Sequence, residues 1–161
     1  MEIPKIYLET TIFNFPFVDD APVLRAGAIG LFREIEAGKF EPFTSEYVIN
    51  ELEKTKDTEK REKMKALITD YGVKVMAGNN EAIRLANLYV EEGIIPKKKG
   101  ADAIHIASAT IAKLDFIVSL NFQHIVKHKT IRETERINAR EGYGKIYIYT
   151  PLEVVEYEED T

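Results

Sequence analysis

The most apolar stretch of the chain runs from residue 100 to residue 125. Alanine and isoleucine occupy most positions from 101 to 112, and a helix that is apolar on every side belongs in the interior of a domain. A short apolar run follows at residues 116–120, which is typical of a strand buried on both faces. A buried helix that leads into a buried strand predicts a parallel α/β sheet. Two polar residues mark the ends of this unit, since Asp102 opens the helix and Asn121 follows the strand.

Apolar periodicity and end signals predict the remaining elements. Helices are expected at residues 22–37, 45–55, 57–71, 81–92 and 130–140, and strands at 5–8, 41–44, 74–76, 116–120 and 146–149. We expect Ser45 to cap the second helix, and we interpret the aromatic segment at residues 13–17 as a loop. The connections are too long for hairpins, which implies right-handed parallel crossovers. The sequence therefore predicts a three-layer α/β/α domain with a central, mostly parallel sheet of about five strands.

Length and composition narrow the class of protein. The 161 residues are expected to form one domain at 1–155 with an acidic C-terminal tail at 156–161. The absence of cysteine excludes a disulfide scaffold and thiolate metal sites, and fits a reducing cytoplasm. No apolar run reaches about 18 residues, so we expect no membrane span and a cytoplasmic protein. The net charge of −5 argues against a nonspecific nucleic-acid coat but is compatible with an acidic metal pocket.

Four polar residues are the candidates for chemistry. In a parallel sheet, ligands bind outside the carboxyl ends of the strands. Glu9 and Asn121 each follow a strand at that edge, and the helix that Asp102 opens points its N-terminus to the same edge. Glu51 lies on the core-facing side of its helix, where a carboxylate must be paired, protonated or bound to a metal.

Each candidate also has a purely structural interpretation. Glu9 can simply end a strand, and Asn121 can stabilise a turn. Asp102 can complement the helix dipole, whereas Glu51 can pair with a buried lysine or arginine. His105 lies one turn after Asp102, and we favour a satisfied core residue over a contact with the site.

Other motifs are absent or weak. His124 and His128 are four residues apart and are expected to share a helix face, but no third ligand accompanies them. The sequence contains no GxGxxG, Walker A or GxSxG motif. Carboxylates without cysteine suit a hard cation such as Mg²⁺ or Mn²⁺, which makes metal-assisted phosphodiester hydrolysis the leading reaction class.

Four short motifs resemble those of the PIN-domain nucleases and, within them, the VapC-like toxins of toxin–antitoxin pairs. The resemblance covers residues 5–152, and its motifs are YLETTIF, SEYVINELEK, GADAIHIASA and DFIVSLNFQHI. It implies a metal-dependent ribonuclease that cleaves RNA with Mg²⁺ or Mn²⁺, is neutralised by an antitoxin protein and forms a homodimer.

The resemblance also assigns residues. It places Glu9, Glu51 and Asp102 as metal ligands, and puts Asn121 where many members have a fourth acid. Thr11 and its neighbour Thr10 match a small hydroxyl position that assists the site. The sequence departs from the pattern twice, since Glu9 is one methylene longer than aspartate and Asn121 lacks a negative charge.

Basic residues at 97–99 and 127–132 flank the predicted site at the carboxyl edge of the sheet and can contact RNA phosphates. The alternative is that both segments are only solvated surfaces. The aromatic segment 13–17 can stack bases, although burial in the core or a dimer is the favoured use. Two alternatives to the ribonuclease stay open at this stage. One is a catalytically weak or inactive PIN-like module that binds RNA or protein, and the other is a hard-metal hydrolase of small phosphoesters.

Overall fold

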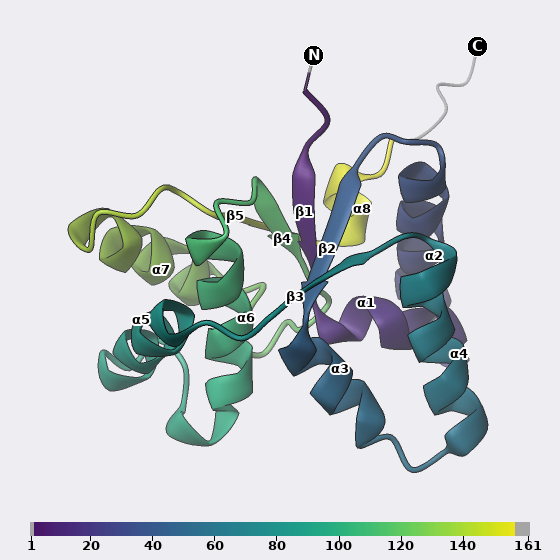
Figure 1. Cartoon of the computed structure of the whole chain (residues 1–161), viewed down its shortest axis with the longest axis horizontal. Helices are drawn as coiled ribbons and strands as arrows, with labels where there is room; N and C mark the ends of the chain where they lie inside the picture. The colour runs from purple at the N-terminus through teal and green to yellow at the C-terminus, as the bar shows by residue number, and fades with distance from the viewer. Residues whose placement is uncertain (1, 157–161) are drawn as a thin grey trace.

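A five-stranded parallel sheet forms the centre of the computed structural model, which describes residues 2–156 (Figure 1). The strands lie in the order β3-β2-β1-β4-β5, and every neighbouring pair is parallel. The predicted three-layer α/β/α class is confirmed, with a sheet that is entirely parallel. The strands are β1 (Lys5–Leu8), β2 (Glu41–Ser45), β3 (Lys74–Met76), β4 (Phe116–Val118) and β5 (Tyr147–Tyr149).

Helices cover both faces of the sheet. Figure 1 shows α5 (Asn80–Glu91), α6 (Gly100–Ile111) and α7 (His128–Arg140) on one side. The other side carries α1 (Thr10–Asn14), α2 (Pro22–Glu36), α4 (Thr58–Asp70) and the single turn α8 (Pro151–Val154). The helix α3 (Glu46–Glu53) follows β2 and contacts both α4 and α6, so it joins the two layers at the carboxyl edge of the sheet.

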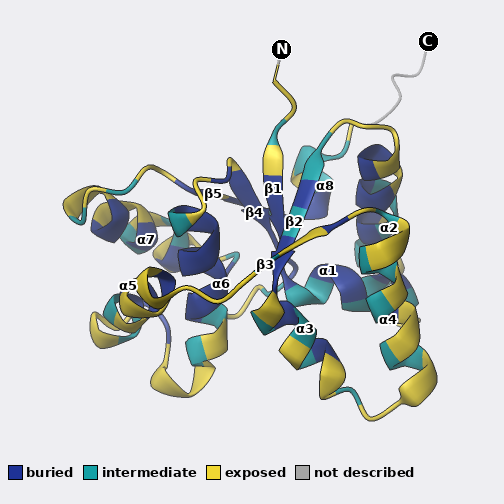
Figure 2. Ribbon diagram, in the orientation of Figure 1, coloured by how far each residue is buried: buried dark blue, intermediate teal, exposed yellow. Residues whose placement is uncertain are grey.

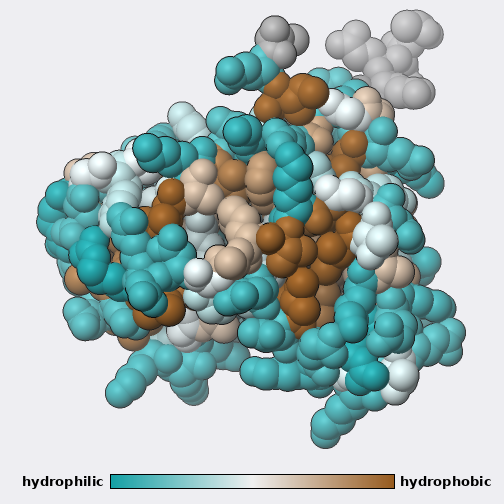
Figure 3. Space-filling view, viewed as in Figure 1, coloured by the Kyte–Doolittle hydropathy of each residue, from teal (hydrophilic) through white to brown (hydrophobic). Residues whose placement is uncertain are grey.

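Burial follows the position of each element in the layers (Figure 2). Residues 6–8 of β1 and all of β4 are buried, as expected for central strands covered on both faces. Eight consecutive residues of α6, from 103 to 110, are buried, which confirms the prediction of an interior helix. At the edge of the sheet, β3 leaves Val75 45% exposed, and Figure 3 shows an apolar area on an otherwise largely hydrophilic face.

The prediction of a loop at the aromatic segment is wrong. Residues 10–17 form α1 and the 3₁₀ helix η1 (Phe15–Phe17). Glu9 caps α1 by accepting a hydrogen bond from the backbone N–H of Thr11. Phe13 is fully buried, with its ring 6.0 Å from that of Phe32. Burial of the aromatic side chain thus fixes a short helix that the local pattern did not reveal, and the favoured core role holds for Phe13.

Other boundaries differ by a few residues. The strand β4 ends at Val118, two residues earlier than predicted, and α7 begins at His128. His124 therefore precedes the helix, and the prediction that His124 and His128 share a helix face is wrong. Lysines 97–99 form a second 3₁₀ helix, η2 (Lys97–Lys99). Of the predicted acidic tail, residues 157–161 lie outside the described residues.

The part of the chain from residue 2 to residue 156 contains no helix with both the length and the apolarity needed to cross a membrane.

Candidate active site

The strand order creates a crevice between β1 and β4. From β1 the chain proceeds through β2 to β3 on one side, whereas β5 lies beyond β4 on the other. Such a switch point, at the carboxyl ends of the strands, is where open α/β sheets bind their ligands. Glu9 directly follows β1, and its backbone N–H donates to the carbonyl of Val118 at the end of β4 over 3.2 Å. The first predicted site residue therefore lies at the switch point itself.

All four predicted site residues line one cavity of about 250 Å³ at this edge. Glu9 comes from the end of β1, Glu51 from α3, Asp102 from the first turn of α6, and Asn121 from the segment after β4. Thr10, Thr11, Asn14, Leu52, Thr55 and Met64 complete the lining. The structure thus brings together residues that are more than 100 positions apart in the sequence.

Glu9 is almost completely buried, with 2% of its surface exposed. Its Oε1 accepts hydrogen bonds from the Thr11 hydroxyl at 2.5 Å, the Ser119 hydroxyl at 2.7 Å and the Thr11 N–H at 3.2 Å. Burial raises the pKa of Glu9, and the charge of His105 and these hydrogen bonds only partly oppose that effect. This carboxyl therefore holds a proton more readily than an ordinary glutamate.

Glu51 pairs with His105. The His105 Nε2 and the Glu51 Oε1 are in direct hydrogen-bond contact, and the imidazole is fully buried while 30% of the Glu51 side chain is exposed. Burial acts to raise the pKa of Glu51, but the hydrogen bond and charge of His105 outweigh it and the pKa falls. Burial likewise acts to lower the pKa of His105, but Glu51 and the neighbouring carboxylates raise it. Both shifts favour the charged form of each group and therefore an ion pair between them.

His105 is both a satisfied core residue and a contact of the site. Its other ring nitrogen, Nδ1, lies 2.7 Å from the Tyr7 hydroxyl, which in turn lies 2.7 Å from the Ser45 hydroxyl. Glu51 is thus paired with this histidine. The structural interpretation of Glu51 from the sequence expected a buried lysine or arginine instead. The helical spacing of His105 from Asp102 was a usable signal, but the roles of Tyr7 and Ser45 were missed.

Ser45 occupies the N-cap position of α3, as predicted, but its side chain makes no capping hydrogen bond. Its hydroxyl is committed to Tyr7 instead. Burial raises the pKa of Tyr7, so the phenol stays protonated and links Ser45 to His105. A buried chain of polar groups therefore runs behind the cavity and ends at Glu51.

Asp102 and Asn121 both line the cavity and lie next to each other. Burial raises the pKa of Asp102, opposed first by a hydrogen bond from Asn121 and then by His105 and His124. The Asn121 Oδ1 accepts the backbone N–H of His124 at 3.1 Å, and the Asn121 N–H donates to the Ser119 hydroxyl at 3.0 Å. Asn121 therefore stabilises the turn after β4 and also borders the site.

Positive side chains flank this edge. Lys97, Lys98 and Lys99 are exposed on η2, immediately before the helix that carries Asp102. In the second basic segment, Lys129 donates to the carbonyl of Gly93 at 3.0 Å and Arg132 lies 3.5 Å from Glu133. The lysines of η2 are thus more available for phosphate than Lys129 and Arg132.

The donor set of the cavity fits a hard divalent cation, because its carboxylate, amide and hydroxyl oxygens are the ligands that Mg²⁺ and Mn²⁺ prefer. The side chains, however, do not converge: among residues 2–156, no three His, Asp or Glu groups are close enough together to hold a metal ion. One carboxylate oxygen of Glu51 is bound to His105 and one of Glu9 to Ser119, so coordination of one ion by all three acids requires these carboxylates to reorient.

The fold and the cavity define an α/β domain with an acidic cavity at the switch point of its sheet. Comparisons of the sequence with protein-family models and with curated proteins find no match.

Proposed function

We propose that the protein is a metal-dependent endoribonuclease that hydrolyses RNA phosphodiesters. The single observation that carries the proposal is the cavity at the switch point, which Glu9, Glu51, Asp102 and Asn121 line together. Carboxylate and amide oxygens that line one cavity at the carboxyl edge of a parallel sheet are of the ligand type that a hard cation prefers. The motif resemblance to PIN-domain nucleases supports the same chemistry. It also extends the proposal to a cytoplasmic toxin that acts as a homodimer and is neutralised by an antitoxin protein.

Each of the four predicted site residues has a role in this proposal, as do His105 and the lysines of η2. Glu9, Glu51 and Asp102 hold the ion, which when bound supplies a Lewis acid for the phosphate and lowers the pKa of an attacking water. His105 keeps Glu51 ionised, and its contacts with Tyr7 and Glu51 fix the orientation of the imidazole. Asn121 holds the turn that borders Asp102, and the lysines of η2 attract the phosphate backbone.

The test is RNA cleavage by the purified protein in Mn²⁺. We expect Glu51→Gln and Asp102→Asn each to lower the rate by more than about 100-fold, because each removes a charge from the cavity. Glu53→Gln is the matched control, since Glu53 lies on the same helix but is exposed and pairs with Lys65 at 2.6 Å. Absence of cleavage by the wild-type protein, or full activity in both cavity variants, contradicts the proposal.

One observation favours a second candidate, a PIN-like module that binds RNA or protein without cleaving it. The ion pair between Glu51 and His105 turns one proposed ligand away from a common centre. Calorimetric titration with Mn²⁺ separates the two functions. Saturable binding below millimolar concentrations supports the nuclease, and its absence supports the binding module.

A further inference from the structure

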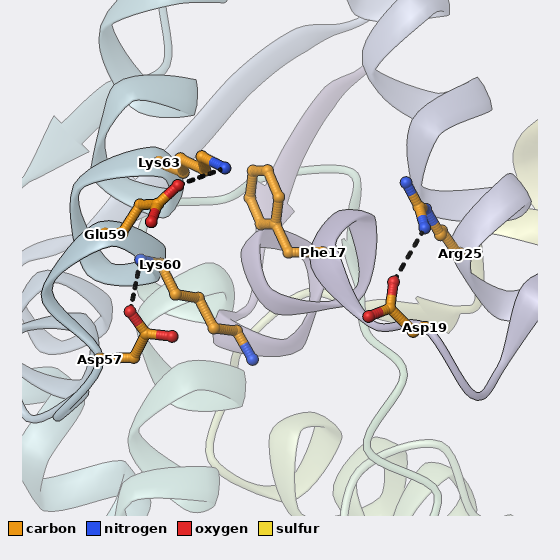
Figure 4. Close-up of a pocket in the computed structure, with 7 residues that line it drawn as sticks. All are labelled: Phe17, Asp19, Arg25, Asp57, Glu59, Lys60 and Lys63. Carbon is orange, nitrogen blue, oxygen red and sulfur yellow. Dashed lines mark hydrogen bonds and ion pairs between the residues drawn. The ribbon is translucent and has the colours of Figure 1, made fainter.

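A second hollow, of about 370 Å³, opens beside the candidate active site (Figure 4). We call it the Phe17 groove. It lies between η1 and the start of α2 on one wall and the first two turns of α4 on the other. Its lining residues are Phe17, Asp19, Arg25, Asp57, Glu59, Lys60 and Lys63.

The Phe17 groove and the active-site cavity are lined by neighbouring residues of the same two walls. On the first wall, Asn14 lines the cavity and Phe17, three residues later, lines the groove. On the second wall, Met64 lines the cavity and Lys60, one turn earlier on α4, lines the groove. The helices α1 and α4 are in contact, so the two walls belong to one packed unit. A linear ligand bound in the cavity therefore has a hollow along which to continue.

The charges of the groove are mostly paired with each other. Lys63 lies 3.1 Å from Glu59, and Arg25 lies 3.4 Å from Asp19. Asp57 caps α4 by accepting the backbone N–H of Lys60 at 3.1 Å. By contrast, the ammonium of Lys60 forms no ion pair with any residue between 2 and 156. One cation in the groove is thus available to an external anion.

Figure 4 shows the ring of Phe17 in the middle of the groove, with Glu59 and Lys63 on one side and the Arg25–Asp19 pair on the other. The side chain of Lys60 extends away from α4, and its ammonium lies below the ring in this view. Phe17 is only half-buried, so the ring is accessible to solvent. The groove thus contains a half-buried aromatic ring and an unpaired ammonium. Single-stranded nucleic acids use both features, with a base stacked on the ring and a phosphate held by the cation.

We propose that the Phe17 groove binds the single-stranded RNA segment that flanks the cleaved phosphodiester. Phe17 stacks on an unpaired base, and Lys60 contacts the adjoining phosphate. A duplex is disfavoured because its paired and stacked bases do not offer a free face to the ring. This inference rests on the proposed ribonuclease function and adds to it a requirement for unpaired RNA next to the cut.

The test measures binding of a fluorescent oligouridylate of about ten nucleotides by anisotropy, with Ca²⁺ in place of Mn²⁺ and intact RNA verified on a gel. We expect Phe17→Leu and Lys60→Gln each to weaken binding about 5- to 10-fold. Lys60→Gln should also reduce the slope of log affinity against log salt by about 0.7, which loss of a purely structural contact does not do. A hairpin of the same length with a fully paired stem should bind more weakly than the oligouridylate.

The chain offers a matched control at the opposite edge of the sheet. Lys145 and Tyr147 form an exposed lysine–aromatic pair beside the amino end of β5. The Lys145 ammonium lies 4.5 Å from the ring centre and 3.6 Å from Glu135. Lys145→Gln and Tyr147→Leu should leave the affinity and the salt slope unchanged.

The possible outcomes distinguish failure of the proposed RNA-binding groove from failure of the proposed ribonuclease function. If the wild-type protein binds and cleaves RNA but Phe17→Leu and Lys60→Gln bind it with unchanged affinity, the groove is not an RNA-binding site. The proposed nuclease function is then unaffected. A wild-type protein that neither binds nor cleaves RNA overturns the nuclease and the groove together. If Phe17→Leu fails to fold, as judged by circular dichroism, the surface variant Lys60→Gln decides through its affinity and its salt slope.

Discussion

The carboxylate of Glu9 illustrates how one methylene changes a site. The motif that the sequence resembles contains an aspartate at the end of the first strand. The longer Glu9 side chain in this protein accepts three hydrogen bonds on a single oxygen. Ser119 provides one of them across the switch point, from the end of β4, and also accepts the backbone N–H of Asn121. The Ser119 hydroxyl therefore joins the two strands that frame the cavity.

Ser119→Ala should lower the free energy of unfolding by about 1–3 kcal/mol, because it removes one hydrogen bond of Glu9 and leaves the Asn121 N–H unpaired. Urea denaturation measures the change. Ser108→Ala is the control: the Ser108 hydroxyl is buried without a hydrogen-bond partner in the described part of the chain, so its loss should be neutral or stabilising. Equal losses in the two variants would contradict the assigned role of Ser119.

The ion pair between Glu51 and His105 predicts a pH dependence. The pKa of His105 is raised in the folded state, so its contribution to stability is complete below about pH 6.5, the ordinary imidazole pKa, and is lost as pH rises through the folded value. The pKa of Glu51 is lowered, so its contribution is complete above about pH 4.3 and is lost as pH falls through the folded value.

We therefore expect the free energy of unfolding of the wild-type protein to decline as pH rises above about 6.5, and to decline less in Glu51→Gln. Urea denaturation at several pH values gives both profiles. Glu53→Gln should keep the wild-type profile in this range, because the partner of Glu53 is a lysine. Identical profiles in wild type and Glu51→Gln would show that the histidine is neutral throughout.

At the scale of elements, α2 contains two glycines that differ in how closely the chain packs against them. An added Cβ on Gly27 would lie 3.0 Å from the Leu152 side chain of α8, whereas one on Gly30 would meet Val155 at an ordinary 3.5 Å. Glycine within a helix costs about 1 kcal/mol relative to alanine, so the sequence accepts this cost for the approach of α8. Only the first of the two positions requires it.

Gly30→Ala should accordingly raise the free energy of unfolding by about 0.5–1 kcal/mol. Gly27→Ala should gain less or destabilise, because Leu152 must move to admit the methyl group. Thermal and urea denaturation of the two variants make a direct comparison. A larger gain at Gly27 than at Gly30 would contradict the described packing of α8 on α2.

At the scale of the whole molecule, ligand binding and folding are linked. Three carboxylates from β1, α3 and α6 line one cavity, so an ion that binds them stabilises only the folded chain. At about 100 times its dissociation constant, Mn²⁺ should add about 2.7 kcal/mol to the free energy of unfolding. That gain corresponds to a rise in melting temperature of roughly 5–10 °C.

Asp102→Asn should lose most of this rise, and Glu53→Gln should retain it. Calorimetric or fluorescence melting with and without Mn²⁺ measures the difference. A rise that persists in Asp102→Asn would place the ion elsewhere, and no rise in the wild type would favour the binding module over the nuclease.

The sequence by itself determined the class of fold and the edge of the sheet on which the candidates lie. An apolar pattern with a period of 3.6 residues, or a continuous apolar run, can be recognised within a short segment of sequence. Residues 100–120 alone therefore indicated a buried helix and a buried strand. Long connections then required parallel crossovers, and these bring residues after strands and before crossover helices to one edge. Glu9, Asp102 and Asn121 were therefore assigned to one edge without knowing the strand order, whereas Glu51 was chosen because it lies on the core-facing side of its helix.

Tertiary structure alone decided how those residues are engaged. The strand order set β1 beside β4, and packing of Phe13 into the core produced α1 where a loop was predicted. His105 meets Tyr7 and Glu51 across separations of 98 and 54 residues, and Ser119 meets Glu9 across 110. A local pattern records which side chains must be buried but not which polar partner each one finds, because that choice depends on the assembled core.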